Sequence, residues 1–369
     1  MDSNERQLTN QKPKRGIVLL NMGGPDSLDS VKPFLYNLFS DPDIIRLPFS
    51  AILQKPLAAL IVALRGEESK ENYKHMGGFS PQLPRTQEQA EALRVELSKR
   101  LGEDIPVYIA MRYWHPFTEE AVARIKQDGI EELIILSLYP HFSYTTTGSS
   151  LNALQQALSA VNYPIANVVI EPYYNHPDYL DAFAETIQEG LDKHTWGCPK
   201  ENVRILFSAH SLPVKHVQRT KDPYPEQIRA SAETVMTKYF PSYEWDLSFQ
   251  SRVGKMPWLG PYIDGVLHYY AGLNQDNILI VPISFVSDHV ETLVELDRDY
   301  VNLAHDLGIQ YCHRAPVMND RPSFIHTMAN LVCHAMTESD HKYQEALQGA
   351  QRQILPDYDS VKTVPLTLN

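Results

Sequence analysis

The sequence predicts an α/β fold built from two similar halves, each with a parallel, doubly wound sheet. Short apolar runs alternate with segments of helical periodicity along most of the 369 residues, a pattern typical of βαβ units. The runs are nearly continuous and rich in β-branched residues, as expected of parallel strands buried on both faces. In addition, residues 132–154 and 277–293 both read as an apolar strand, an aromatic-bearing loop and a polar helix start.

The apolar runs place the expected strands at 16–22, 106–112, 132–138, 166–171, 203–209, 245–251, 277–284 and, more weakly, 309–312. Helical periodicity falls between them, at 27–39, 86–101, 118–128, 149–161, 177–193, 224–239, 261–271, 288–306 and 322–337. We therefore expect an N-terminal half at 15–195, a C-terminal half at 196–340 and a loosely ordered tail at 341–369.

Composition excludes several classes of protein. Asp and Glu number 45 against 33 Lys and Arg, a net charge of −12, and a surface of this sign is a poor ligand for nucleic acid. The longest strongly apolar stretch, 56–64, is far shorter than the ~20 residues of a spanning helix, and the polar N-terminus lacks the apolar core of a secretory signal. Widely spaced Cys198, Cys312 and Cys333 suit a reducing cytoplasm and cannot supply the four thiolates usual for an iron–sulfur cluster.

The unusual segments of the chain all follow expected strands. They read NMGGP, MRYWHP, YPHFSYTTTGSS, SAHSLP, FQSRVGKMPWLGP and SFVSDHVETL. In open α/β sheets the ligand lies beyond the carboxyl ends of the strands, so we expect the site there. GGP and TTTGSS are alternatives for cradling a phosphate at a helix start, but neither is a dinucleotide or Walker fingerprint.

His210 stands at such a strand end, between small neighbours. Its side chain titrates near neutrality and ligates borderline metals, whereas an isolated histidine is more often a hydrogen-bonded structural residue. Asp288, Glu291, Glu295 and Asp299 share one face of the expected helix. Capping of the helix N-terminus explains Asp288 and Glu291 but not Glu295 and Asp299. An acidic stripe of this kind would suit delivery of a divalent cation.

Aromatic and apolar side chains cluster near the same strand ends and would line a flat slot with Arg112 at its rim; they are Met22, Tyr113, Trp114, Tyr139, Phe142, Trp258 and Phe285. Each alone is more often core packing. The apolar segment 49–65, which carries Lys55 and Arg65, is either a buried helix pair or a lip that contacts a membrane surface or admits an apolar ligand.

These motifs resemble the ferrochelatase family, enzymes that insert ferrous iron into a porphyrin to make haem. The matching stretches are LLNMGGPDSL, GGFSP, MRYWHPFTEEA, YPHFSYTTTGSSLNAL, ILFSAHSLP, DPYPEQ, FQSRVGKMPWLGPYID and VPISFVSDHVETLVELD, in family order from Leu19 to Asp297. The resemblance implies two Rossmann-like, chelatase-type halves with a porphyrin in the cleft between them. From the resemblance, the cysteine pattern and the apolar segment 49–65 together, we expect a cytoplasmic enzyme that can make peripheral contact with the inner membrane through that segment.

Site residues follow from the same resemblance. His210 matches the histidine of SAHSLP and Glu291 the glutamate of the DHxE motif, the two iron-site positions of the family. Met22, Arg112, Tyr113, Trp258, Phe285 and His289 match or neighbour porphyrin-pocket positions. Glu295 and Asp299 fall where relatives carry an acidic path for iron. The partners implied are protoporphyrin IX and Fe²⁺, with no nucleic acid and no permanently bound cofactor.

Three departures from the family pattern matter. The segment TKDPYP has Lys221 where glycine is frequent, with one extra residue, so a different local loop is expected. Tyr144 stands where cluster-bearing relatives have a cysteine, which predicts no [2Fe–2S] cluster. NMGG resembles the protoporphyrin type rather than the coproporphyrin III type. Two alternatives stay open: a related chelatase using coproporphyrin III, or Co²⁺ or Ni²⁺ with another tetrapyrrole, and a non-catalytic porphyrin or haem carrier.

Overall fold

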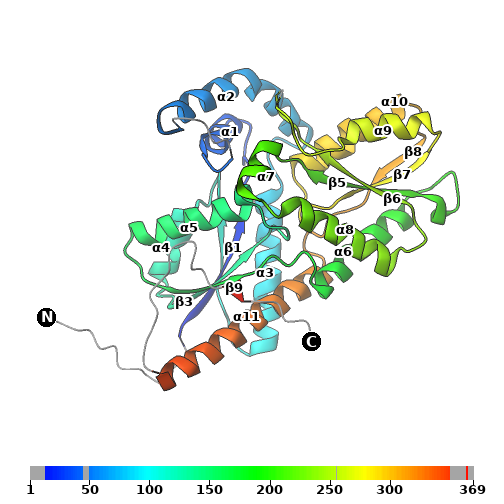
Figure 1. Cartoon of the computed structure of the whole chain (residues 1–369). Helices are drawn as coiled ribbons and strands as arrows, with labels where there is room; N and C mark the ends of the chain where they lie inside the picture. The colour runs from blue at the N-terminus through cyan, green and yellow to red at the C-terminus, as the bar shows by residue number, and fades with distance from the viewer. Residues whose placement is uncertain (1–12, 45–49, 255, 350–362, 365–369) are drawn as a thin grey trace.

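The computed structural model describes residues 13–44, 50–254, 256–349 and 363–364, and within them it has two parallel sheets (Figure 1). The first has the order β2-β1-β3-β4-β9 and the second β6-β5-β7-β8. Their bounds are β1 Arg15–Asn21, β2 Val107–Met111, β3 Glu132–Ser137, β4 Ala166–Ile170, β5 Arg204–His210, β6 Trp245–Gln250, β7 Asn277–Pro282, β8 Tyr311–Arg314 and β9 Thr363–Val364. The prediction of an α/β fold with two similar halves is confirmed.

The helices fall largely where periodicity placed them. They are α1 Val31–Ser40, α2 Ser50–His75, α3 Gln82–Leu101, α4 Thr118–Gln127, α5 Ser149–Ala160, α6 Pro177–Lys193, α7 Val214–Thr220, α8 Tyr224–Tyr239, α9 Ile263–Gly272, α10 Val301–Asp306 and α11 Pro322–Gly349, with a short 3₁₀ turn η2 at Lys200–Asn202. Helix α11 continues past residue 341, so the expected start of the tail falls inside a helix.

Two segments are wound as π-helices, which periodicity did not predict. They are η1, Tyr144–Gly148, and η3, Glu291–Tyr300. η1 follows β3 and η3 follows β7, the third strand of each half in chain order. Segments of this kind occur often at functional sites, and both lie at the sheet edge where the sequence places the ligand.

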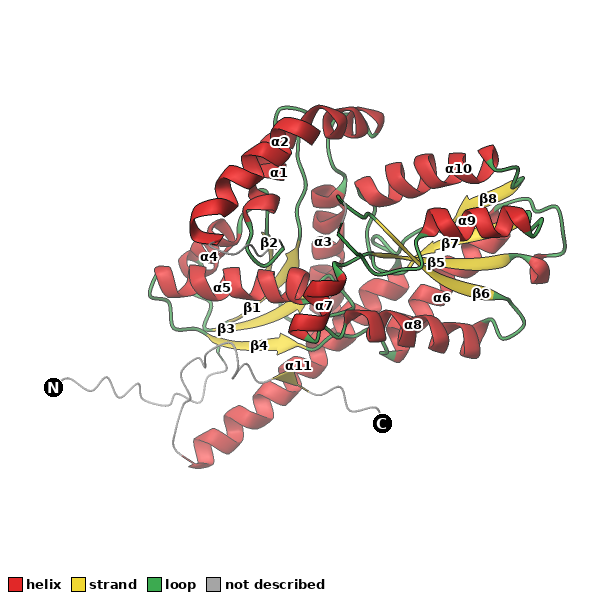
Figure 2. Cartoon of the chain, turned by 45° about the horizontal axis from the view of Figure 1, so that its top comes forward, coloured by secondary structure: helices red, strands yellow, loops and turns green. Residues whose placement is uncertain are grey.

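The two halves exchange one helix each. Helix α6, at the end of the first half of the chain, packs on β7 and α8 of the second half, and α11 returns to pack on α3, β3 and β4 of the first (Figure 2). One core therefore runs through both halves, from Leu19 and Leu93 to Phe207 and Leu279. A division of the chain at residue 196 does not separate two independent packing units.

Charged groups fasten α11 to the first sheet. The guanidinium of Arg15, buried at the start of β1, pairs with Glu132 of β3 and with Asp340 of α11, and Ser339 also donates to Glu132. A buried guanidinium needs such partners. These contacts hold the turns of α11 that lie beyond residue 337, where the apolar periodicity of the sequence had placed the end of the helix.

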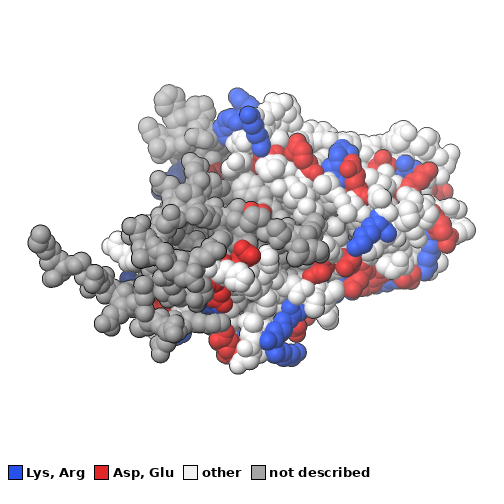
Figure 3. All heavy atoms as spheres, turned by 60° about the horizontal axis from the view of Figure 1, so that its bottom comes forward, with Lys and Arg blue, Asp and Glu red and all other residues white. Residues whose placement is uncertain are grey.

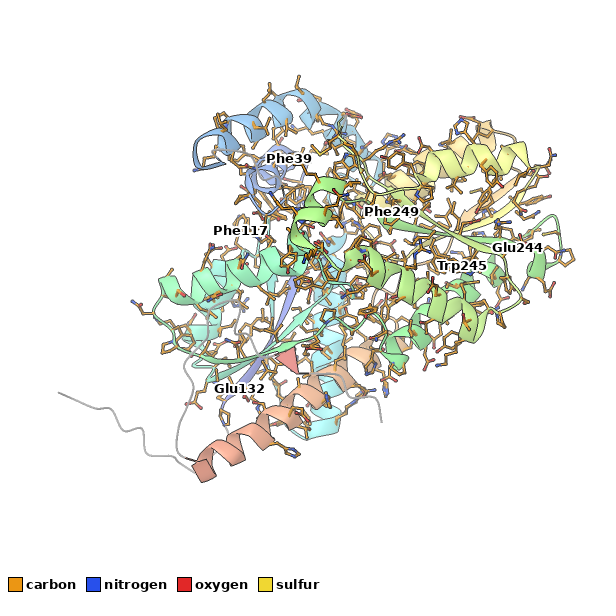
Figure 4. All side chains as sticks on the ribbon, viewed as in Figure 1. Phe39, Phe117, Glu132, Glu244, Trp245 and Phe249 are labelled. Carbon is orange, nitrogen blue, oxygen red and sulfur yellow. The ribbon has the colours of Figure 1, made fainter. Side chains whose placement is uncertain are left out.

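The carboxyl ends of the two sheets converge on the middle of the molecule. In Figure 4, Glu244 and Trp245 mark the outer start of β6 and Phe249 its inner end, while Glu132 marks the start of β3, far from Phe39 and Phe117 near α1. Helices α1 and α2 pack together above this region (Figure 1). The loops that follow both sets of strands therefore face one another below α1 and α2.

The loop at Lys221 begins with a left-handed residue, at a position where the family pattern often has glycine. Lys221 ends α7 with φ of 52°, the left-handed region in which glycine is usual after a helix. Asp222 follows, and its buried carboxylate accepts from the hydroxyl of Ser143 at 2.8 Å and the amide of Tyr144 at 3.0 Å. The loop thus joins the second half to the turn that begins η1.

The surface is mixed in charge. On the face shown in Figure 3, described acidic and basic side chains are interspersed among uncharged ones, consistent with the many surface ion pairs between neighbouring residues, such as Arg94 with Glu91 and Asp104. Across the described segments, each helix is either too short or too polar to traverse a bilayer.

Candidate active site at the strand ends

His210 and Glu291 face each other at the carboxyl edge of the second sheet. His210 is the last residue of β5 and Glu291 the first of η3, and His210 Nδ1 lies 2.9 Å from Glu291 Oε2. Their side chains are 35% and 18% exposed, so the pair is close-packed yet open to solvent. The structure brings together the two residues that the sequence singled out.

Their mutual attraction sets their charge. Burial by itself raises the pKa of Glu291, but the charge and hydrogen bond of His210 outweigh burial and lower that pKa. Burial likewise lowers the pKa of His210, and the opposing charge and hydrogen bond of Glu291 raise it. The pair therefore favours an imidazolium–carboxylate state, which can exchange protons or, once deprotonated, offer nitrogen and oxygen to a cation.

Ser251 links Glu291 to the second acid of η3. Its backbone N–H donates to Glu295 Oε1 at 2.8 Å, and its hydroxyl contacts Glu295 and, at 3.4 Å, Glu291. Its φ of 65° is unusual for a non-glycine residue. Burial, followed by repulsion from Glu291, raises the pKa of Glu295. The sequence motif FQSRVG contained Ser251, yet the residue type alone gave no signal of this role.

The acidic stripe is not continuous. Asp299 is exposed and pairs with its neighbour Arg298, Nε to Oδ1 at 2.6 Å. Asp288 is held by Asn319, Thr292 and Arg314. Thus Glu295 joins Glu291 through Ser251, whereas Asp299 and Asp288 lie in separate ion pairs or hydrogen-bond networks.

His289 lies behind Glu291. Its ring is buried, its Nδ1 is 3.1 Å from the carbonyl oxygen of Ser287, and its Nε2 is 3.9 Å from Glu291 Oε2. Its edge meets the ring of Phe285, with 4.4 Å between the centroids. Burial lowers the pKa of His289, which favours a neutral ring next to the charged pair.

Met22 and Trp258 approach from opposite halves. Met22 is half-buried against the apolar cluster formed by α1, Tyr73 and Tyr113, to which Val290 also contributes. Trp258 donates its indole N–H to the carbonyl of Val253 at 2.9 Å, and it forms an isolated β-bridge with Pro213 in the loop after His210.

Arg112 and Tyr113 are organised by a residue that the sequence did not reveal. The carboxylate of Asp41, buried at the end of α1, lies 2.9 Å from Arg112 Nη2 and accepts from the hydroxyls of Tyr113 at 2.7 Å and Ser149 at 2.6 Å. Tyr113 is only 3% exposed, so it supports Arg112 from below rather than forming an open wall. Asp41 reads in the sequence as a helix-ending Asp-Pro.

A cavity of about 510 Å³ lies beside Arg112 and is lined by Tyr36, Asn37, Asp41 and Lys55 among others. His210 and Glu291 are not among its walls. The cavity therefore extends the region around Arg112 and is distinct from the space in front of the His210–Glu291 pair.

Comparisons with known proteins identify the family of the chain. The family model named Ferrochelatase covers residues 14–336. The chain belongs to the ferrochelatase family. Ferrochelatases of Rippkaea orientalis and Synechococcus elongatus are 45% and 48% identical over 339 and 319 residues, covering 90% and 86% of this chain and 85% and 81% of theirs. The family consists of porphyrin metal chelatases, which are lyases, so the enzyme class expected from the sequence is confirmed.

A solved structure supports the fold independently of sequence. SirB from Bacillus subtilis with Fe³⁺ superimposes with a TM-score of 0.51 at 12% identity, covering 89% of this chain and 98% of that chain. At such low identity the likeness concerns architecture alone. It agrees with the two-sheet, chelatase-type fold.

Proposed function

We propose that the enzyme inserts Fe²⁺ into protoporphyrin IX to form protohaem, as a step of haem biosynthesis. Two pyrrole N–H bonds break, four Fe–N bonds form and two protons leave, with no change in the oxidation state of iron. The observation that carries the proposal is the His210–Glu291 pair, held at 2.9 Å on an open sheet edge. Family membership supplies metal insertion into a porphyrin, and the choice of iron and of protoporphyrin IX is our inference.

The pair has the two capacities that metallation requires. Glu291 raises the pKa of His210, so His210 would first release its proton to solvent and then take one from a pyrrole nitrogen. The anionic carboxylate of Glu291 would attract Fe²⁺ while its water ligands are removed. Glu295, reached through Ser251, would pass protons or iron onward. Asp299 stays a candidate only for the outer end of such a path, since it is exposed and paired with Arg298.

The porphyrin would lie against apolar side chains from both halves, namely Met22, Trp258 and Phe285, with His289 at one edge. Arg112, fixed by Asp41 and supported by Tyr113, would pair with a propionate. Contacts that favour a bent macrocycle lower the barrier to metallation. The proposal includes no resident cofactor and no [2Fe–2S] cluster, since Cys198, Cys312 and Cys333 lie apart in the sequence.

Metallation assays test this function. Wild-type protein is expected to convert protoporphyrin IX and Fe²⁺ to haem, and His210→Ala combined with Glu291→Gln to lose activity by roughly 10²–10⁴-fold. His268→Ala, which removes an exposed histidine of α9, is the matched control. Persistence of near-wild-type metallation in the double variant would favour a carrier, and faster turnover of coproporphyrin III, Co²⁺ or Ni²⁺ would identify a different chelatase.

We also propose that α2 touches a membrane surface. Its outward face exposes Leu53, Leu60 and Leu64, at 48%, 55% and 75%, while Ala58 on the other face is buried. This exposure favours the lip over a fully buried helix pair; residue 49, the first of the expected segment, lies outside the described residues. Exposed leucines at helical spacing beside Lys55 and Arg65 suit an interfacial helix.

Vesicle flotation tests the membrane contact. The wild-type protein is expected to float with anionic vesicles, and Leu60→Asp with Leu64→Asp to stay at the bottom of the gradient. Leu273→Asp, at the residue that follows α9 and as exposed as Leu60, is the control. A wild-type protein that never floats would refute the lip.

A further inference from the structure

Arg314 joins two acids on either side of the catalytic glutamate. It is the last residue of β8 and is 9% exposed. Its Nε and Nη2 donate to the two carboxylate oxygens of Asp297 at 2.6 and 2.9 Å, and Nη2 lies 3.4 Å from Asp288 Oδ1. Its Nη1 donates to the carbonyl of Ala315 at 3.1 Å. A buried, bidentate guanidinium of this kind is geometrically demanding.

The two acids lie on either side of Glu291 along the chain. Asp288 stands three residues before Glu291, in the loop that leads into η3, and Asp297 lies within η3. Arg314 therefore joins the seventh residue of η3 to the loop that precedes η3. In a π-helix the hydrogen bonds run from i to i+5, and such segments are short and uncommon. An ion pair that fixes residue 297 relative to residue 288 restrains rewinding of the chain between them.

Asp288 is itself fixed in place. Its backbone N–H donates to Asn319 Oδ1 at 3.0 Å and its carboxylate accepts from Asn319 Nδ2 at 2.8 Å. Asn319 has φ of 47°, and its carbonyl accepts from Gln89 of α3 in the first half at 2.8 Å. Asp297 is thereby tied, through Arg314, to a fixed point rather than to another mobile side chain.

We propose that Arg314 is a positioning residue that maintains the π-helical winding of η3 and so sets Glu291 against His210. Its charge also balances Asp288 and Asp297, which without it would repel each other near Glu291. This inference rests on the proposed function for its activity readout. It extends that function by proposing that Arg314, at the end of β8, holds the Glu291 carboxylate in position.

The test compares Arg314→Met and Arg314→Lys with Arg204→Met. Arg204 also joins two acids, Glu244 and Asp246, at the outer start of the second sheet (Figure 4), so its loss removes a similar ion pair far from the site. We expect Arg314→Met to lower kcat by about tenfold to a hundredfold, with less than about a twofold change in the porphyrin KM. Arg314→Lys should recover part of kcat, and Arg204→Met should keep it.

Hydrogen exchange supplies a readout that does not depend on activity. Arg314→Met should speed exchange of the amides of 291–300 and leave those of 144–148 unchanged. Asp297→Asn, which keeps the arginine, provides a milder variant should Arg314→Met fail to fold, and it should change kcat and exchange in the same direction. Wild-type kcat with unchanged protection of 291–300 in these variants would overturn the inference. An inactive wild type with the expected exchange pattern would refute the proposed function instead.

Discussion

The first four strands of the first sheet have the same order as the four strands of the second sheet, but the two sheets carry different groups at corresponding places. Strand β1 corresponds to β5 in this order. β1 ends in Asn21, a buried amide bonded to Thr86 at 3.0 Å and Gln82 at 3.2 Å. β5 ends in His210, which reaches solvent and bonds to Glu291. One strand end therefore holds a satisfied neutral group, and its counterpart holds an ionisable pair.

The π-helices repeat the contrast. In η1 the inward groups are hydroxyls, with Ser137 Oγ 3.0 Å from Thr147 Oγ1, whereas η3 presents Glu291 and Glu295. The first half instead keeps its charge in Asp41 and Arg112, which compensate each other. The comparison shows that the shared scaffold supplies positions, and that residue type at those positions divides the work. In the function proposed above, the first half would hold the porphyrin and the second would move protons and metal.

The largest expected effect is on the metallation rate, when the strand end of the second half is given the residue type of the first. In His210→Asn, β5 ends in asparagine, as β1 does at Asn21. The metallation rate should fall by roughly 10²–10⁴-fold, because asparagine neither accepts a proton nor ligates iron as imidazole does. Porphyrin binding, followed by fluorescence, should persist. Haem formation at the wild-type rate in this variant would refute the claim that His210, unlike Asn21, takes part in the chemistry.

Removing the buried carboxylate of Asp41 in the first half should lower the free energy of unfolding. Asp41→Ala leaves the Arg112 guanidinium and the hydroxyls of Tyr113 and Ser149 without their acceptor, so the free energy of unfolding should drop by about 3 kcal/mol. Urea denaturation measures the change. Asp43→Ala, which removes a single bond from Asn152 at 3.1 Å, serves as control and should cost less than about 1 kcal/mol. Equal losses in both variants would contradict the role given to Asp41.

His141, in the loop after β3, is a buried histidine, in contrast to His210, which reaches solvent. Burial lowers its pKa from 6.5 to about 3, so between these pH values the unfolded chain binds a proton that the folded protein does not. The free energy of unfolding should therefore decrease as pH falls below about 6.5, by up to roughly 1.4 kcal/mol per pH unit from this group.

His141→Gln tests this dependence, because glutamine does not titrate and can still reach Ser231, to which His141 Nε2 lies at 2.9 Å. Its unfolding free energy, measured from pH 7 to 4, should fall less steeply than that of wild type. Parallel curves would show that His141 is not responsible for acid sensitivity.

The smallest effect is expected in η1. Thr147→Val removes the hydroxyl that meets Ser137 and should lower the free energy of unfolding by about 1 kcal/mol without altering kcat. Glu295→Gln is the comparison in η3 and should reduce kcat while changing stability little. A drop of kcat in Thr147→Val as large as in Glu295→Gln would mean that η1 also takes part in the chemistry.

Strand positions could be predicted from sequence because apolar, β-branched runs report burial on two faces. β6 was expected at 245–251 and spans Trp245–Gln250; α8 was expected at 224–239 and spans those residues. The π-helical winding of η3 could not be predicted from the sequence. Acidic residues four positions apart share a face in an α-helix and in a π-helix alike. The seven residues of α7 are too few for a periodic signal.

The strand-end position marked His210 and the acidic stripe marked Glu291, whereas the resemblance to the ferrochelatase family implied that the two belong to one site; the structure places them 2.9 Å apart. Asp41 was missed because its partners, Arg112 and Ser149, are distant in sequence, and nothing near an Asp-Pro turn indicates them. Arg314 and Ser251 were missed for the same reason: their importance lies in long-range contacts to η3 rather than in local pattern.

The helix exchange has a consequence for synthesis of the chain. Helix α11, which covers β3 and β4 of the first sheet, is the last of the described helices to leave the ribosome, whereas most domains fold as their own sequence emerges. Until residue 322 and its successors are translated, the early strands have an uncovered apolar side. The nascent protein should therefore need shielding for most of its elongation, and a fragment cut at residue 195 should aggregate rather than behave as a half-enzyme.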